Sequence, residues 1–255
     1  FNDFGRRGRD LRRRILMAME KAVDAAIARS ARVFLICGDL FDSPYPAREA
    51  LALLDSMLGR LAAAGIKTAI IPGTHDPPGS PVFSSPVFTS RPLEVTLITP
   101  ERPFAVLPEL DLAIGAWFPS REHSREWIGP PDNWHRRMRF RIGMAHGSAP
   151  FGPAAESAEE LIPRELFFDP ALHYLALGHH HSEGPVAQSS MPAYYSGSPE
   201  ILAVDQKGAG HVILATLSER AGEVTALIEK IKVGSLNFKK LAIDAAEIAA
   251  GQIGR

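Results

Sequence analysis

Short apolar runs that alternate with a helical pattern constrain the fold of this chain most strongly. Arg32–Cys37 and Lys67–Ile71 are short and almost wholly apolar. The segment between them reads as a helix from about Pro46 to Ala64, because Pro46 suits a first helical turn and Gly65 a C-terminal cap. Strands without polar alternation are typical of a parallel sheet that is covered on both faces. The sequence therefore predicts an α/β protein.

The same patterns predict the elements around this unit. Six arginines lie within residues 6–14, and an apolar residue recurs every fourth position after Asp10, which indicates an amphipathic helix ending near Ser30. Its arginines belong to a solvated face or contact phosphates. We also expect two further strands, Leu112–Phe118 and Phe140–Ala145, and a helix over Glu156–Phe168 that is interrupted at Pro163. An antiparallel pair, His211–Leu217 with Val224–Val233, should turn at Gly222.

Two connecting segments are candidates for ligand contacts. The proline-dense stretch between Pro72 and Pro108 is interpreted as a loop with brief extended pieces, and long loops in compact domains tend to be functional. In a second connection, Trp127, Trp134 and the pair Arg136-Arg137 interleave aromatic and basic side chains. They could stack on a nucleic acid strand, and a surface loop explains them equally well.

The composition limits the class of protein. With 255 residues, 45% hydrophobic and 22% charged, we expect one main domain over residues 1–235, followed by a tail or the start of a capping domain over 236–255. A net charge of -1 gives no overall attraction to nucleic acid or membrane. Cys37 is the one cysteine, so no intramolecular disulfide can form. No apolar run approaches the roughly 20 residues that cross a bilayer, and we expect a cytoplasmic protein.

Four apolar runs end where an Asp or a His follows. These ends are Gly38-Asp39, Gly73-Thr74-His75-Asp76, His146-Gly147 and Gly178-His179-His180-His181. Ligands of an open parallel sheet bind beyond the carboxyl ends of its strands. Alternate residues of an extended segment point the same way, so His179 and His181 can converge while His180 faces elsewhere.

Each of these ends has a plainer reading when it is taken alone. Asp39 could be a helix N-cap, His75 could belong to a turn, and the three histidines could form a His-rich surface loop. Four such strand ends together favour a metal site. Carboxylate and imidazole without thiolate suit manganese, iron or zinc, and two such ions about 3.5 to 4 Å apart would serve phosphoryl transfer from an activated water.

These residues resemble the calcineurin-like metallophosphoesterase superfamily, whose successive motifs are Asp-x-His, Gly-Asp-x-x-Asp, Gly-Asn-His-Asp, a lone His and Gly-His-x-His. Within it, the Gly38–Asp42 and Tyr174–His179 stretches and the segment Tyr195–Glu200 look most like the SbcD-type DNA repair nuclease branch. The resemblance implies a four-layer α/β/β/α metallophosphoesterase sandwich with mixed sheets. It also implies a DNA exonuclease or endonuclease, two divalent ions, and a dimer working with an SbcC-like ATPase.

The resemblance also implies roles for single residues. Asp39 would bridge both metals, His146 and His179 would bind the second, and His181 would bind the first. His75 would assist the leaving oxygen, with Asp76 holding its ring, and Asp42 would support a site residue by hydrogen bonding or be structural. Thr74 stands where the family has Asn, so the second metal would bind less tightly or complete its shell with water.

The family's opening Asp-x-His motif is missing from the sequence, and we expect that the sequence starts after it. Three hypotheses remain: a DNA phosphodiesterase, a phosphoesterase acting on a nucleotide, lipid or protein phosphate, and a degenerate, non-catalytic scaffold of the same fold. The metal site does not read the substrate, and the altered motifs leave the scaffold hypothesis open.

Overall fold

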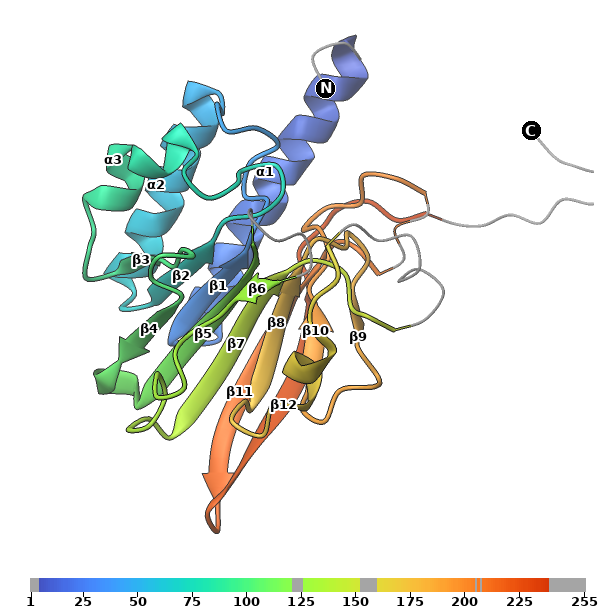
Figure 1. Ribbon diagram of the computed structural model, residues 1–255. Coiled ribbons are helices and arrows are strands. Elements are labelled where there is room, and N and C mark those ends of the chain that lie inside the picture. Colours follow the sequence, from blue (N-terminus) through green and yellow to red (C-terminus); the bar gives the residue numbers. More distant parts are fainter. Residues whose placement is uncertain (1–4, 121–125, 152–159, 205, 207, 239–255) are drawn as a thin grey trace, which may run out of the picture.

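Two β-sheets packed face to face, with helices on one side, form the body of the molecule (Figure 1). The structure is a computed structural model and describes residues 5–120, 126–151, 160–204, 206 and 208–238. The first sheet is wholly parallel, in the order β1-β2-β3, and comprises β1 (Val33–Cys37), β2 (Lys67–Ile71) and β3 (Val95–Leu97). Its strands β1 and β2 are those that the apolar runs predict.

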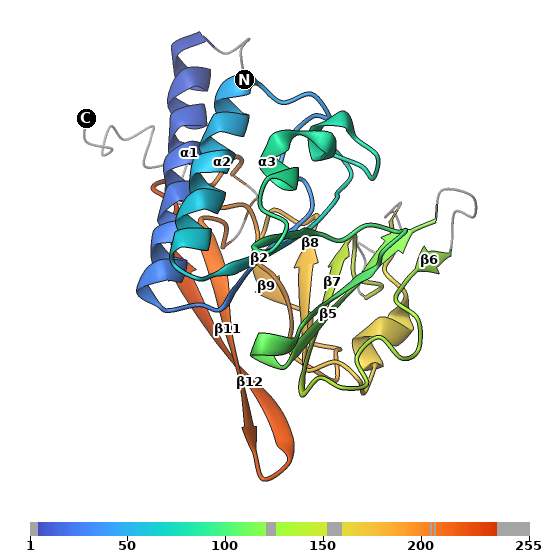
Figure 2. The ribbon, with the colours of Figure 1, turned by 90° about the vertical axis from the view of Figure 1, so that its left-hand side faces the viewer.

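Three helices cover the outer face of the first sheet (Figure 2); they are α1 (Gly5–Ala28), α2 (Arg48–Ala63) and α3 (Pro86–Thr89). Leu54 and Leu58 of α2 pack with Ile70 of β2 in one apolar cluster. Helix α2 matches the prediction, whereas α1 begins before Asp10, within the arginine-rich stretch. Among the described residues, no helix combines the length and the apolar character that a membrane span needs.

The second sheet is mixed, in the order β4-β5-β7-β8-β10-β9, with β6 paired to β5. Its central strands β5, β7, β8 and β10 are parallel, and β4 and β9 are antiparallel edges. Its strands are β4 (Phe104–Leu107), β5 (Leu112–Pro119), β6 (Trp127–Ile128), β7 (Phe140–His146), β8 (Tyr174–Gly178), β9 (Gly184–Pro185) and β10 (Ala193–Tyr195).

The main core lies between the two sheets. Ile71 of β2 packs there with Ile114 of β5 and Met144 of β7, and all three side chains are almost fully buried. The long hairpin of β11 (His211–Arg220) and β12 (Glu223–Lys232) adds Leu217 and Ile228 to the same layer. It turns at Ala221-Gly222, both with positive φ, as the sequence predicts.

The outer face of the second sheet is covered by a 3-10 helix, η5 (Arg164–Phe168), and by connecting segments. The helix predicted over Glu156–Phe168 is described from residue 160 only. There residues 160–163 are not helical, and Arg164–Phe168 is a 3-10 turn instead of an α-helix. Trp134 is 8% exposed and packs edge-on against Trp117, so the stacking role considered for it is wrong. The predicted fold class, an α/β sandwich, is confirmed, and the second of its two sheets is mixed.

The Ser196–Glu200 segment has a structural function. Glu200 is fully buried, and its carboxylate accepts hydrogen bonds from Ile201 N–H, from the N–H and hydroxyl of Ser235, and from Leu236 N–H. Burial opposes ionisation, but these donors hold the pKa of Glu200 below its usual range. Glu200 thus fixes the chain that leaves β12. Of the predicted tail, residues 239–255 lie outside the described part.

Candidate metal centre

The carboxyl ends of strands from both sheets meet at one place. β1 and β2 end there in the first sheet, and β7 and β8 end there in the second. The approach is so close that a Cβ on Gly178 would overlap the carbonyl oxygen of Cys37, and one on Gly38 would overlap the ring of His146. Both glycines are therefore required for the sheets to meet.

Asp39 and His146 form the centre of this place. Oδ2 of Asp39 lies 3.2 Å from Nε2 of His146, whose side chain is 5% exposed. Nδ1 of His146 lies 2.7 Å from the carbonyl oxygen of Cys37. Because a carbonyl can only accept, Nδ1 carries the hydrogen and Nε2 of the neutral ring has a lone pair.

Nε2 of His146 makes no hydrogen bond to any described residue. It therefore faces Asp39 Oδ2 as one electron-pair donor facing another, which is favourable only with a proton or a cation between them. Adjacent ligand atoms of an ion with bonds of about 2.1 Å lie about 3 Å apart, and a histidine ligand usually donates its other N–H to a carbonyl or carboxylate. The pair fits a divalent metal on both counts.

Electrostatics at the pair favour positive charge. Burial opposes ionisation of Asp39, but the His146 ring and the N–H of His75 lower its pKa. Burial likewise opposes protonation of His146, but Asp39, the Cys37 carbonyl and Glu160 raise its pKa. A proton or a metal cation would satisfy the same pair.

His179 lies next to this pair. Its ring centroid is 5.4 Å from that of His146, and burial and the charge of His146 lower its pKa, which favours the neutral, ligating form. The backbone φ is +96° at His179 and +49° at Asp39. A left-handed conformation is costly at non-glycine residues and concentrates at functional sites. His180 turns to the ring of Tyr195, 4.7 Å away, although the segment after Gly178 is not the extended strand from which the alternation was argued.

His181 has a different environment. It is exposed, and its Nδ1 lies 2.8 Å from the amide nitrogen of Gln206. The amide oxygen of Gln206 accepts hydrogen bonds from the N–H groups of Leu202 and Ala203, which fixes the amide orientation. Nδ1 of His181 is therefore the acceptor, and Nε2 of the neutral ring carries the hydrogen. In this orientation His181 presents a donor rather than a lone pair.

His75 and Asp76 have separate roles. The side chain of His75 is 56% exposed, and its Nδ1 lies 3.5 Å from Asp42 Oδ1. Asp76 is fully buried and accepts hydrogen bonds from the N–H groups of Asp39, Phe41 and Gly73. The expected contact of Asp76 with the His75 ring is therefore corrected, because Asp76 holds the two strand-end loops and Asp42 is the carboxylate beside His75.

Thr74 contacts Glu160, which was not among the predicted site residues. The Thr74 hydroxyl donates to Oε2 of Glu160 at 3.0 Å. Glu160 and His146 line a common cavity of about 630 Å³ with Thr74 and with an apolar wall that includes Phe118 and Ile128. No motif marks Glu160, because its position depends on backbone contacts to the segment after β7.

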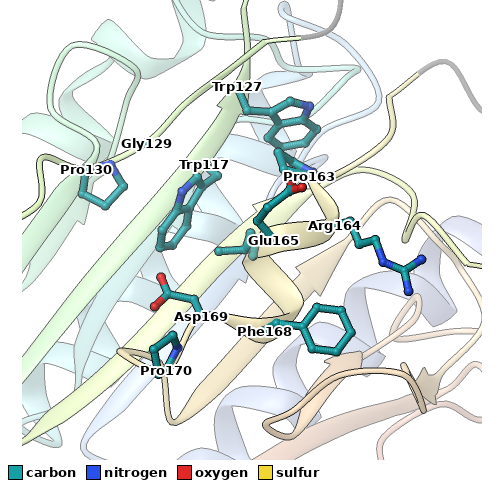
Figure 3. Close-up of a pocket in the computed structure, with 11 residues that line it drawn as sticks. Trp117, Trp127, Gly129, Pro130, Pro163, Arg164, Glu165, Phe168, Asp169 and Pro170 are labelled. Atoms are coloured by element: carbon teal, nitrogen blue, oxygen red, sulfur yellow. The ribbon is translucent and has the colours of Figure 1, made fainter.

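A second hollow shares Trp117 with this cavity. It has a volume of about 760 Å³ on the outer face of the second sheet, between Trp117, Trp127 and the η5 residues Arg164 and Glu165 (Figure 3). None of the predicted site residues lines it. Among the described residues, no group of three or more His, Cys, Asp or Glu has the mutual geometry of a metal site. An ion held by Asp39 and His146 would need further ligands from neighbouring side chains that turn toward it.

Comparisons with known proteins concern the fold alone. No family model matches the chain, and no curated protein matches it. The solved structure of TT1561 from Thermus thermophilus is similar to this chain, with a TM-score of 0.51 and 14% identity over 85% of this chain and 92% of that one. A second solved structure, 11% identical over 84% of this chain and 93% of its own, has a TM-score of 0.46 and supports no argument.

Proposed function

We propose that this protein is a metal-dependent phosphodiesterase of the calcineurin-like superfamily and its SbcD-type nuclease branch. The observation that carries the proposal is the pair of Asp39 Oδ2 and His146 Nε2, 3.2 Å apart, from strand ends of two facing sheets. His179 lies beside that pair. Manganese is the first choice of metal, with iron and zinc as alternatives, and carboxylate and imidazole donors suit all three.

The residues of the site would divide the work of hydrolysis. Two divalent cations would neutralise charge on a phosphodiester and lower the pKa of water. Asp39, His146 and His179 would hold one of them. His75 is exposed enough to reach a bound phosphate and would assist the leaving oxygen, while Asp42 holds its ring.

Substitution at the centre tests this proposal. In the presence of manganese, Asp39→Ala and His179→Ala should each lower hydrolysis of bis(p-nitrophenyl) phosphate more than about 100-fold, because ligand loss exceeds the 10- to 100-fold cost of losing a supporting contact. His211→Ala is the control, since His211 lies at the start of β11 and bonds the Gly208 carbonyl. Unchanged rates in both site variants would remove the assignment.

A small phosphoester is the second candidate substrate. Of the described residues that line the cavity beside His146, none is Lys or Arg, and Glu101 and Glu160 are acidic. Proteins that bind DNA usually neutralise its phosphates with several basic side chains. Parallel assays on duplex DNA, single-stranded DNA and small diesters separate the two candidates, because a nuclease cleaves DNA with the higher kcat/KM.

The setting of the activity is proposed on the resemblance. We place the protein in the cytoplasm as a homodimer that acts on DNA with an SbcC-like ATPase. The free thiol of Cys37 suits a reducing compartment, and burial raises its pKa to about 12, so that it stays a thiol. The scaffold alternative predicts a protein that binds no metal and hydrolyses none of these substrates.

A further inference from the structure

The hydroxyl of Thr74 is hydrogen-bonded to another side chain. Thr74 stands where the resembled family has a metal-binding asparagine, and its hydroxyl donates to Glu160 Oε2 at 3.0 Å. A hydroxyl can donate one hydrogen, and that hydrogen is turned to the carboxylate. The contact orients Glu160 and leaves its second oxygen, Oε1, for another partner.

Glu160 is held close to the metal centre by the backbone. The N–H of Ser148, two residues after His146, donates to the Glu160 carbonyl at 2.8 Å. Ile162 N–H donates to the Ser148 carbonyl at 2.9 Å, and Ser148 and Leu161 form a parallel bridge. These bonds attach the Glu160 segment to the end of β7. A carboxylate placed by backbone pairing is preorganised for a site at the same strand end.

Glu160 lies near His146, whose Nε2 is 3.2 Å from Asp39 Oδ2. Glu160 and His146 line the same cavity. Nε2 of His146 is buried and makes no hydrogen bond to any described residue. The negative charge of Glu160 acts on the rings of both His146 and His179, so the three side chains share one electrostatic environment. A cation between Asp39 and His146 would lie within this environment.

We propose that Glu160 supplies a carboxylate ligand to the cation held by Asp39 and His146, and that Thr74 positions this carboxylate instead of binding the metal itself. A hydroxyl is a weak ligand, whereas a carboxylate adds a full negative charge. A carboxylate oxygen of Glu160, oriented by Thr74, would then take the place of the amide oxygen of the family's asparagine, so an oxygen ligand stays at the centre. This inference rests on the proposed metal centre.

Titration calorimetry of the full, metal-free chain with MnCl₂ tests the inference without reference to activity. Glu160→Gln should weaken manganese binding about tenfold or more, because the charge is lost while the side-chain volume is kept. Thr74→Val should weaken manganese binding less than Glu160→Gln does, and Thr74→Ser, which keeps the hydroxyl, should bind manganese as the unaltered protein does. Adding Thr74→Val to Glu160→Gln should weaken manganese binding little further. Glu165→Gln is the matched control, since Glu165 is an exposed carboxylate five residues further along.

The outcomes separate this inference from the proposed function. If the unaltered protein binds manganese and Asp39→Ala abolishes binding, while Glu160→Gln behaves as Glu165→Gln does, Glu160 is not a ligand and the metal centre stands. If the unaltered protein binds no manganese, both proposals fall. Circular dichroism melting of each variant checks folding, and Glu160→Asp, which keeps the charge at shorter reach, replaces Glu160→Gln if that variant does not fold.

Discussion

Glu200 joins two distant parts of the chain through one buried carboxylate. Its two oxygens accept four hydrogen bonds, two of them from Ser235. The side chain of glutamine accepts hydrogen bonds at one oxygen only. In Glu200→Gln, the amide N–H₂ would therefore face buried N–H and hydroxyl groups that are themselves donors. We predict a loss of about 2 to 3 kcal/mol in the free energy of unfolding at pH 7.

The pH dependence of this loss follows from the lowered pKa of Glu200. Because the pKa of Glu200 is lower in the folded protein than in the unfolded chain, where it is about 4.3, the ionised carboxylate stabilises the fold above that pH. This stabilisation is lost as pH falls through the folded pKa. The difference between the unaltered protein and Glu200→Gln should therefore shrink below pH 4. Urea unfolding from pH 7 to 3 measures it, and Glu223→Gln, at the exposed start of β12, is the control. A difference independent of pH would contradict the account.

Single site residues differed in how far they could be predicted. Asp39, His146 and His179 follow apolar runs, and ligand-binding side chains gather at the carboxyl ends of parallel strands. The local sequence pattern was therefore enough to predict that these three residues lie close together. Glu160 could not be predicted, because its place depends on pairing with Ser148. The pairing of His75 with Asp42 rather than Asp76 is a matter of side-chain distance and has no sequence signal.

At the scale of elements, the junction of β1 and β8 sets the position of the centre. Gly178 ends β8 against the carbonyl of Cys37 at the end of β1, with no room for a Cβ. Gly178→Ala should lower the free energy of unfolding by about 3 kcal/mol, the upper part of the usual range for overpacked interiors, because backbone must move. It should also weaken manganese binding.

Gly184→Ala is the matched control for Gly178→Ala. Gly184 lies in β9 of the same sheet, and a Cβ there would meet no atom within 4 Å. Thermal and urea unfolding of both variants compare the two positions. Equal stability of Gly178→Ala and Gly184→Ala would show that β1 and β8 do not approach as closely as described.

Most regular elements could be predicted, because their apolar periodicity is local. β2 and the β11–β12 hairpin have nearly the predicted bounds. The burial of Trp134 could not be predicted, because it depends on Gly115 of β5, where a side chain would overlap the indole. Long-range packing of this kind leaves no periodic pattern in the chain.

At the scale of the whole molecule, the two sheets serve to bring the ends of β1, β2, β7 and β8 together (Figure 1). Neither sheet alone holds the centre, since Asp39 follows the first sheet and His146 ends the second. This arrangement explains why the residues come from four separated segments of the chain. It also means that any ion at the centre would stabilise the contact between the sheets.

The most direct test of the account is the position of a bound ion. Crystals soaked in MnCl₂ and measured for anomalous scattering should show a peak between Oδ2 of Asp39 and Nε2 of His146, within bonding distance of both atoms. In Asp39→Ala crystals the peak should be absent. No peak at that place in the unaltered protein at saturating manganese, or a peak only elsewhere, would contradict the central claim that these two strand ends hold a cation.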